Sequence, residues 1–399
     1  MLVARKIRIL VSDHDAKTLE FMQSKSRALY NWWLGKLKSG EKWNFVEAKR
    51  SLKASREHDP ELNDVYGMLL AEVYFRLDRA MQAFFRRVKK GEKPGFPRFR
   101  PRHKFFSLVY PGRYIKLKGN KVILPTGGKG KNKKYHSVRG ILTEKPPREY
   151  RSVVVSRDAS GKYYCSFMYD KEVLGQSNKG GIVAFDLGIK TLAMGVTDSG
   201  RDYEIGGFTG YRWFNKQLDK IRSLRSRCKK GSRRYKFLSE TYQKVSAKRR
   251  NKLKDCLHKA SHLIACKLAE SAVIVGDLSQ REMVSKSDNK KLNRAVYNNW
   301  GLYEFITQLK YKCKLSGKDL YLESEKGTSK TCFCCGSQQE MPLYKREYFC
   351  TSCGIKINRD ANSARNILLR HIARQEPEKL LGAYSVLGVR PRNQVFITT

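Results

Sequence analysis

Residues 330–370 read KTCFCCGSQQEMPLYKREYFCTSCGIKINRDANSARNILLR, and this stretch holds two Cys-x-x-Cys pairs, each followed by glycine. Glycine allows the tight backbone turn that a zinc knuckle needs to aim its sulfur atoms at the metal. Four thiolates around one Zn²⁺ make a closed tetrahedral site with a structural role. The stretch therefore predicts a zinc ribbon with one structural Zn²⁺, and its ligands would be Cys332, Cys335, Cys350 and Cys353.

Two alternatives to this ligand set stay open. Cys334 is a surplus candidate, although the pair Cys332/Cys335 keeps the two-residue spacing and the following glycine. The cysteines could also be free or joined in disulfides. Ten cysteines, four of them at metal spacing, are typical of a reducing compartment. We therefore expect a cytoplasmic, nucleoid-associated protein in a prokaryote, or a nuclear protein in a eukaryote.

The charge of the chain predicts a polyanionic partner. Lys and Arg number 82 against 37 Asp and Glu, which gives a formal net charge of +45 spread over the whole length. Such an excess is typical of proteins that bind nucleic acid through its phosphates, with salt-dependent affinity. We find no signal peptide and no run of about 18 apolar residues, so we expect no membrane partner.

With 399 residues, the chain is too long for one ordinary core, so we expect two or three domains. Hydrophobic spacing in the first part predicts a strand, two helical stretches and then several strands, at residues 3–12, 15–39, 61–90 and 104–172. This order predicts a β-barrel interrupted by helices. Glycine-rich segments at residues 127–134 and 175–181 indicate a basic loop and a linker.

The second part alternates strands and helices. From residue 181 the pattern predicts a strand–turn–strand, long basic helices, a strand, a helix, a strand, the ribbon and a last helix, with bounds near 213–271, 272–278, 298–316, 318–323 and 361–373. This order is typical of an α/β layer with a mixed sheet. The tail after Pro377 has no clear pattern.

Two acids stand at element ends. Asp186 ends the apolar strand Ile182–Phe185, where a carboxylate must be paired, solvated or bound to metal. Asp360 follows the last ribbon cysteine by seven residues and starts a helix, where a capping aspartate is the plain alternative. In so basic a chain, the two acids together favour Mg²⁺-binding carboxylates. Two such ions would support phosphodiester hydrolysis.

Four motifs carry a family resemblance, namely VAFDLGIKTLA at 183–193, GDL at 276–278, TSKTCFCCG at 328–336 and CTSCGIKINRDANSARNIL at 350–368. They resemble TnpB, the transposon-encoded RNA-guided DNA nucleases with a RuvC-like (RNase H-fold) domain, which are related to type V CRISPR effectors and to Fanzor proteins. The resemblance covers most of the chain and is specific from residue 181 onward. Before that it depends on Tyr30-Asn31 and on GFPRFR at 95–100.

The resemblance implies an α/β multidomain architecture. A wedge-type β-barrel would span residues 1–12 and 104–174, with a helical recognition insert at 13–103. A RuvC-like nuclease domain would span 181–326 and 357–375, with the zinc ribbon of 327–356 inserted as a target-nucleic-acid-binding module and a tail at 376–399. The resemblance also implies a guide RNA derived from the transposon end and cleavage of double-stranded DNA beside a short flanking motif.

One position departs from the family pattern. Members commonly carry Glu before Asp-Leu in the second motif, and this chain has Gly276 there. Asp277 should point away from Asp186, because strand side chains alternate. Glu323 and Glu325 lie two residues apart just before the ribbon, and Glu325 best matches the relocated glutamate of some relatives. We therefore expect the catalytic set, which would hold two Mg²⁺, to be Asp186, Glu325 and Asp360.

Other functions stay open at this stage. Without a third carboxylate, the protein would resemble nuclease-dead TnpB derivatives that act as RNA-guided repressors. We favour the active enzyme, because an inactive site has no reason to keep Asp186 and Asp360. A strand-joining transposase is a weaker hypothesis, since the sequence has no obvious HUH pair or catalytic tyrosine motif.

Several basic residues are candidates for contact with nucleic acid. In the loop at 95–102, arginines alternate with aromatic rings, a combination that can stack on bases and hold phosphates. A basic helical face at 217–254 suits a channel for an RNA–DNA hybrid. Arg365, one helical turn past Asp360, would contact the scissile phosphate or pair with that acid. The full candidate set is Arg98, Arg100, Arg102, Arg249, Arg250, Lys259 and Arg365.

Overall fold

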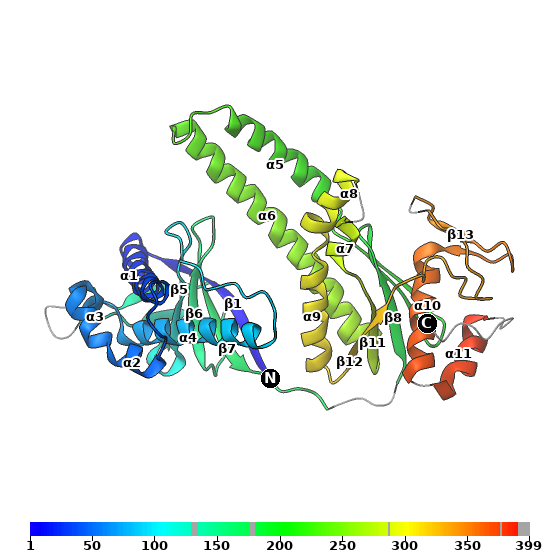
Figure 1. Cartoon of the computed structure of the whole chain (residues 1–399), viewed down its shortest axis with the longest axis horizontal. Helices are drawn as coiled ribbons and strands as arrows, with labels where there is room; N and C mark the ends of the chain where they lie inside the picture. The colour runs from blue at the N-terminus through cyan, green and yellow to red at the C-terminus, as the bar shows by residue number, and fades with distance from the viewer. Residues whose placement is uncertain (129–134, 176–179, 286–287, 343, 376, 390–399) are drawn as a thin grey trace. The chain divides into compact units, whose positions relative to one another are not determined.

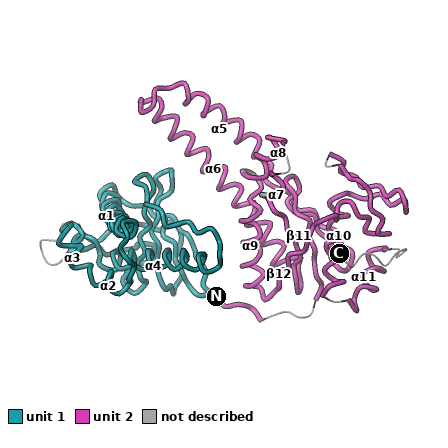
Figure 2. The backbone as a smooth tube through the Cα atoms, viewed as in Figure 1, with its two compact units in different colours: residues 1–171 teal, residues 172–399 magenta. Residues whose placement is uncertain are grey.

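The structure is a computed structural model that describes residues 1–128, 135–175, 180–285, 288–342, 344–375 and 377–389. The chain forms two compact units, Met1–Lys171 and Glu172–Thr399 (Figure 2). The first unit has one hydrophobic core, and the second has two. None of the described helices is both long enough and apolar enough to cross a membrane.

The first unit contains one antiparallel seven-stranded sheet in the order β2-β6-β7-β1-β5-β4-β3. Its strands are β1 (Leu2–Val11), β2 (Leu108–Pro111), β3 (Lys116–Lys118), β4 (Lys121–Leu124), β5 (Val138–Leu142), β6 (Ser152–Arg157) and β7 (Tyr163–Asp170). Among the described residues, no hydrogen-bonded pairing joins the edge strands β2 and β3. The closed wedge-type barrel therefore stays a prediction.

The helices of the first unit come between β1 and β2 in the chain, except for one short turn (Figure 1). They are α1 (Asp13–Lys38), α2 (Phe45–Arg50), α3 (Leu52–His58), the 3₁₀ turns η1 (Pro60–Asp64) and η2 (Gly112–Tyr114, which follows β2), and α4 (Gly67–Lys89). Ser12 caps α1 by accepting a hydrogen bond from the Asp15 N–H at 3.1 Å. The apolar stripe of α1, including Leu19, Met22 and Leu34, then packs with α4 in the core.

The second unit contains a mixed five-stranded sheet in the order β10-β9-β8-β11-β12. Its strands are β8 (Ile182–Leu187), β9 (Thr191–Thr197), β10 (Asp202–Gly206), β11 (Ala272–Asp277) and β12 (Asp319–Ser324). The first three strands pair antiparallel, whereas β8, β11 and β12 run parallel. The sheet of the expected α/β layer is therefore mixed, and the hairpin predicted after residue 181 gains β10 as a third strand.

Helices cover both faces of this sheet (Figure 1). On one face, Phe185 and Val275 pack against α6 (Arg233–Leu263) and α9 (Leu302–Leu315). On the other face, Ala184 and Ile274 pack against α10 (Arg359–Gln375). Because strand side chains alternate, Asp186 and position 276 face the same side as Ala184 and Ile274, toward α10. Both central strands are apolar on both faces, as buried parallel strands are.

Shorter elements complete the second unit. They are α5 (Tyr211–Ser226), which forms a hairpin with α6, the π-helical turns η3 (Ile264–Leu268) and η4 (Val296–Trp300), α7 (Gln280–Ser285), α8 (Lys290–Ala295), the ribbon strands β13 (Glu347–Phe349) and β14 (Lys356–Asn358), η5 (Pro377–Lys379) and α11 (Leu380–Leu387).

The C-terminal segment differs from the expectation of a patternless tail. Residues 380–387 form α11, and its Ala383 and Leu387 are buried in the core beside α10. The sequence LLGAYSVL is apolar nearly throughout, so it has no helical period that could be recognised. The predicted loops at 127–134 and 175–181 lie mostly outside the described residues, which omit 129–134 and 176–179.

Candidate functional site

Three carboxylates lie near one another at one edge of the mixed sheet. Asp186 lies at the carboxyl end of β8, Glu325 follows the last residue of β12, and Asp360 lies in the first turn of α10. Strands β8, β11 and β12 are parallel, so their carboxyl ends share this edge. The structure therefore brings together the three acids that the sequence analysis selected, although they are far apart in the chain.

The three acids act on one another electrostatically. Burial and, to a lesser extent, the charge of Asp360 together raise the pKa of Asp186 to about 7, although Arg359 and Arg346 oppose this shift. Burial likewise raises the pKa of Glu325 to about 9, with Asp186, Asp277 and Asp360 adding to the effect. Buried carboxylates with other acids nearby resist joint ionisation unless a cation compensates their charge.

Glu325 occupies the space that a side chain at position 276 would fill. A Cβ atom built on Gly276 would overlap Oε1, Cδ and Cγ of Glu325. Oε1 of Glu325 is buried and finds no hydrogen-bond partner in the part of the chain that the structure describes. A buried oxygen without a partner, beside two further carboxylates, fits the oxygen-ligand set that Mg²⁺ prefers. The carboxylate absent from β11 is thus replaced in space by one from the turn after β12.

Glu323, the other glutamate considered for this role, has different partners. Its side chain is buried, its Oε1 lies 3.0 Å from His371 Nδ1, and Arg374 Nη1 donates to its Oε2 at 3.1 Å. Both partners lie within the last two turns of α10. Glu323 therefore connects β12 to α10, and its carboxylate is already occupied.

The turn that carries Glu325 is hydrogen-bonded to α10 at several points. Arg370 Nη1 donates to the Ser324 carbonyl at 2.8 Å. Thr328 Oγ1 donates to the Glu325 carbonyl at 2.9 Å. The Thr328 carbonyl in turn accepts from Asn362 at 3.2 Å and from Asn366 at 2.8 Å. Because Asp360 lies on the same helix, α10 sets the positions of two of the three acids.

Sequence reasoning missed the role of these asparagines. Asn362 and Asn366 are buried, and both also donate to the Thr331 carbonyl, at 2.8 Å and 2.7 Å. Asn362 Oδ1 accepts from the Phe333 N–H at 3.0 Å. The available signal was their spacing of four residues on the apolar side of a helix, where an amide requires buried partners.

Asp360 does not cap α10. Asn358 has that role, because its Oδ1 accepts from the N–H groups of Asp360 at 2.8 Å and Ala361 at 3.3 Å. The Asp360 carboxylate lies 3.4 Å from Arg346 and 3.6 Å from Arg359, and it is mostly covered. The capping alternative for Asp360 is therefore excluded, and its carboxylate is directed to the site. No motif in the sequence indicated the two arginines.

The four predicted ribbon cysteines form one cluster. Their sulfur atoms all lie within 4.8 Å of one another. The Cys332–Cys353 and Cys335–Cys350 sulfur pairs are 3.7 Å and 3.6 Å apart. A tetrahedral Zn²⁺ with Zn–S bonds of about 2.3 Å requires sulfur pairs about 3.8 Å apart. The cluster thus fits Zn²⁺.

Each knuckle turn has the backbone that its glycine permits. Gly336 and Gly354 have φ of 77° and 74°, and their N–H groups donate to the carbonyls of Cys332 and Cys350, both at 2.9 Å. Burial opposes ionisation of Cys350, but hydrogen bonds from Ser337 and from backbone N–H groups lower the pKa of this thiol to about 6. A thiol of this kind is prepared to bind metal as the thiolate.

Cys334 points away from the cluster. Its Sγ donates to the Gly388 carbonyl, with the two atoms 3.5 Å apart, and the side chain is buried. None of the ten cysteines forms a disulfide. The structure thus favours the ligand set with Cys332 over the one with Cys334.

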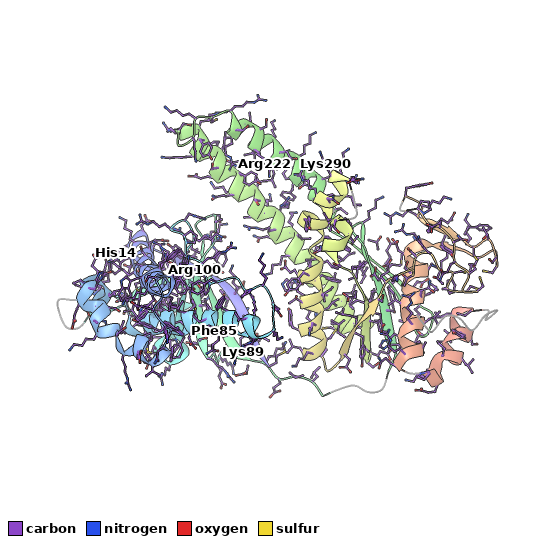
Figure 3. The ribbon with its side chains drawn as sticks, in the orientation of Figure 1. His14, Phe85, Lys89, Arg100, Arg222 and Lys290 are labelled. Carbon is purple, nitrogen blue, oxygen red and sulfur yellow. The ribbon has the colours of Figure 1, made fainter. Side chains whose placement is uncertain are left out.

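The predicted nucleic-acid contacts in the first unit lie on an exposed loop. Arg98, Arg100 and Arg102 are exposed, and Arg100 is labelled in Figure 3. Asn31 holds this loop against α1, because its side-chain amide donates to the Arg100 carbonyl at 3.0 Å and accepts from the Arg100 N–H at 2.7 Å. The two N-terminal segments that carried the family resemblance are therefore in direct contact.

The predicted contacts in the second unit have mixed surroundings. Arg250 is exposed, whereas Arg249 is partly buried and donates to Asn215 Oδ1 at 2.7 Å. Lys259 is exposed and pairs with Asp255 at 2.8 Å. Arg365 pairs with Asp202 of β10 at 2.9 Å and not with Asp360, and its side chain is 11% exposed. Of the two roles considered for Arg365, the structure does not show the pairing with Asp360, because the guanidinium group reaches Asp202 of β10 instead.

Comparison with known proteins gives two matching family models. One, described as "Cas12f1-like, TNB domain", matches residues 303–367, and the other, described as "Probable transposase", matches residues 166–287. A protein of Streptomyces pristinaespiralis named "Putative RNA-guided DNA endonuclease" is 30% identical over 230 residues, which are 56% of this chain and 54% of that protein.

Further relatives are named for the same family. TnpB-like protein L79 of Acanthamoeba polyphaga mimivirus is 29% identical over 156 residues, or 38% of this chain and 29% of the relative. The chain thus spans about half or less of the length of these first relatives. A solved Cas12f1–sgRNA–target DNA complex matches 90% of this chain and 83% of that chain with a TM-score of 0.60 and 14% identity, so it shares the fold. Taken together, the family models and the named relatives show that the chain is similar to TnpB-type proteins.

Proposed function

We propose that this protein is an RNA-guided DNA endonuclease that cuts double-stranded DNA beside a short flanking motif. Asp186, Glu325 and Asp360 would hold two Mg²⁺ at the sheet edge. The observation that carries the proposal is the position of Glu325, whose carboxylate fills the space left by Gly276 and whose Oε1 has no hydrogen-bond partner among the described residues. An inactive site would have no need for a buried, unpartnered carboxylate beside two others.

The proposed domain assignment builds on the same sheet. We assign the RuvC-like (RNase H-fold) domain to residues 181–326 and 357–375, the zinc ribbon to 327–356 and a C-terminal segment to 376–399. The order of three antiparallel strands followed by two parallel ones, with acids on β8 and at the start of α10, supports this assignment. In the first unit we assign a wedge-type barrel to 1–12 and 104–174 and a recognition insert to 13–103.

The residues of the chain have separable roles in the proposed chemistry. Bound Mg²⁺ would supply activation of the attacking water and stabilisation of the leaving oxygen. Asp186, Glu325 and Asp360 would bind and orient the ions as deprotonated carboxylates. Arg346 and Arg359 lie beside Asp360 and would hold that carboxylate in place.

The proposed partners follow from charge and from the family. The guide RNA would derive from the transposon end, and pairing with it would select the target DNA, while the protein would contact backbones and read the flanking motif. The net charge of +45 supports a polyanionic partner on several surfaces. The related Cas12f1 chain was solved with sgRNA and target DNA. We propose the prokaryotic cytoplasm or the eukaryotic nucleus as the compartment.

The deciding experiment uses Gly276→Ala, which keeps every acid of the site. Its added Cβ would push the Glu325 carboxylate out of its place, at little cost in stability because the carboxylate is the end of a flexible side chain. The protein is co-expressed with RNA from its own locus and given matching DNA with a randomised flank and Mg²⁺. We expect Gly276→Ala to lower the cleavage rate by about tenfold to a hundredfold.

Matched variants separate the possible causes. Glu325→Ala should lose cleavage, Glu323→Ala should keep it, and the double change Gly276→Glu with Glu325→Ala should recover part of it. Recovery would show that the site needs a third carboxylate at this point in space, whichever residue of the chain supplies it. If Gly276→Ala and Glu325→Ala both cut at the wild-type rate, the assignment of Glu325 fails. If wild-type protein binds the target tightly and never cuts, the protein is a repressor and not a nuclease.

A further inference from the structure

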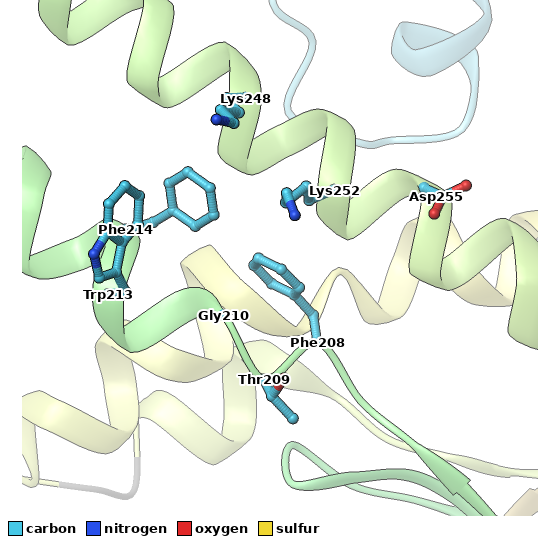
Figure 4. Close-up of a pocket in the computed structure, with 8 residues that line it drawn as sticks. All are labelled: Phe208, Thr209, Gly210, Trp213, Phe214, Lys248, Lys252 and Asp255. Carbon is cyan, nitrogen blue, oxygen red and sulfur yellow. The ribbon is translucent and has the colours of Figure 1, made fainter.

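An open pocket lies where α5 begins, between the segment after β10 and one face of α6 (Figure 4). Its volume of about 510 Å³ is above the lower limit of about 300 Å³ for small-ligand sites. The lining is aromatic on one side and charged on the other, with Phe208, Thr209, Gly210, Trp213 and Phe214 facing Lys248, Lys252 and Asp255. None of these residues belongs to the carboxylate site or to the ribbon.

The aromatic side presents an exposed ring on a fixed support. Trp213 is 56% exposed, whereas Phe214 beside it is buried. The two rings meet edge to face, with centroids 4.8 Å apart and planes at 87°. Phe208 supports Phe214 from the other side at 6.1 Å. An indole held in this way keeps one face free at little further cost in conformational entropy.

The charged side presents two lysines that have no partner among the residues that the structure describes. Lys248 and Lys252 lie one helical turn apart on α6 and are both exposed. Across the described residues, neither ammonium group takes part in an ion pair or hydrogen bond. Asp255, the acid of the pocket, is already paired with Lys259 at 2.8 Å. The pocket therefore offers two positive charges beside an aromatic face.

We propose that this pocket binds an unpaired nucleobase, which stacks on Trp213 while its flanking phosphates contact Lys248 and Lys252. Aromatic rings interleaved with cations are the usual platform for single-stranded nucleic acid. A base within a duplex is already stacked on its neighbours, so the ligand is a base in a single strand or one displaced from a helix. The inference depends on the proposed function only in taking nucleic acid as the ligand.

The first test measures the fluorescence emission of the Trp213 indole. The emission of wild-type protein minus that of Trp213→Phe protein isolates Trp213 from the four other tryptophans. Single-stranded RNA and single-stranded DNA are added separately, each beside a matched strand that lacks its bases. We expect natural strands to quench this emission and abasic strands to leave it unchanged. Quenching by RNA alone identifies a guide nucleotide, and quenching by DNA alone identifies a target nucleotide.

The second test measures the affinity of the protein for a short single strand. Loss of one base–aromatic stack should weaken binding of a short single strand by about tenfold in Trp213→Ala, and Trp213→Phe should keep most of the affinity. Phe237→Ala is the matched control, since Phe237 is 63% exposed on α6 and lies outside the pocket. Lys248→Ala should reduce the dependence of affinity on salt by about 0.7 in the log–log slope.

These tests separate the inference from the proposed function. The Asp186→Asn protein should not cut, yet it should show the same quenching, because Trp213 lies outside the carboxylate site. An enzyme that cuts but shows no base-dependent quenching would overturn the stacking pocket alone. Equal loss of affinity in Trp213→Ala and Phe237→Ala, or equal quenching by abasic strands, would also overturn it.

Discussion

The four-cysteine cluster and the carboxylate site both depend on α10, but they are encoded differently. All four sulfur ligands come from one short segment, and each pair sits in a turn that its own glycine shapes. The three acids come from β8, from the turn after β12 and from α10, so their geometry exists only once the sheet has formed. Local spacing therefore defines the first site, and the packing of distant elements defines the second.

The largest effect should come from breaking the ribbon. Cys335→Ser removes one of four thiolates, so we expect the protein to lose its Zn²⁺ and the ribbon to unfold, because metal binding supplies most of the stability of such sites. Metal analysis of purified protein and protease digestion of the ribbon check this. Cys334→Ser is the matched control and should keep one Zn²⁺ per chain. Loss of zinc in Cys334→Ser but not in Cys335→Ser would reverse the ligand assignment.

The next effect tests whether the two sites are independent. Asp186→Asn should lower the cleavage rate by about a thousandfold or more, because several kcal/mol of transition-state stabilisation depend on the bound ions. Its zinc content should equal that of the wild type. The measurements are single-turnover cleavage and metal analysis on the same preparation. A variant that lost zinc together with cleavage would mean that the ribbon and the carboxylate site form one unit.

A smaller effect contrasts two neighbouring glutamates. Glu323→Ala leaves His371 and Arg374 without their buried partner and should reduce the free energy of unfolding by about 2 kcal/mol. Glu325→Ala removes a carboxylate that has no such partner, so metal-free protein should be no less stable than the wild type. Denaturant unfolding of both variants in Mg²⁺-free buffer checks this. Equal destabilisation would contradict the assigned roles.

The smallest effect is a pH dependence of stability without Mg²⁺. Burial raises the pKa of Asp186 to about 7 and that of Glu325 to about 9, so the folded protein holds protons that the unfolded chain has already released. The stability linked to these groups is complete below about pH 4, their ordinary range, and is lost as the pH rises through about 7 and then about 9. The melting temperature should therefore fall over this window.

The control for this dependence is the double variant Asp186→Asn with Glu325→Gln, whose melting temperature should fall less between pH 5 and pH 9. Mg²⁺ should restore the stability of the wild type at high pH, since it binds the ionised carboxylates. Buffers are kept free of chelators so that the ribbon retains zinc. An equal slope in the wild type and the double variant would show that other groups cause the dependence.

Much of this architecture could be predicted from local patterns. The ribbon ligands, the helix through residues 361–373 and the acid at the end of β8 follow from spacing, period and position. The hydrogen bonds of Asn362 and Asn366, and the diversion of Arg365 to Asp202, could not be predicted, because they join segments far apart in the chain. The same holds for α11, whose apolar sequence has no period, and for the capping role of Asn358.

Glu325 was a special case. The family resemblance suggested this residue, but only the fold explains why position 276 is glycine, since the Glu325 side chain occupies the space beside it. The sequence contains two glutamates at a spacing that places both on one strand face. The structure separates them, because β12 ends at Ser324 and Glu325 already belongs to the following turn. No rule of strand alternation applies across that boundary.

The overlap between Gly276 and Glu325 makes the two positions strongly epistatic. With Glu325 in place, even a methyl group at position 276 displaces the carboxylate, so substitutions there should act through residue 325 and not by themselves. In this protein, a mutational scan should find that only glycine is accepted at position 276. Once the side chain at position 325 is shortened, the same scan should find that position 276 tolerates other residues. Functional sequence searches that require an acid at position 276 would misclassify this chain, whereas a search that scores both positions together would find it.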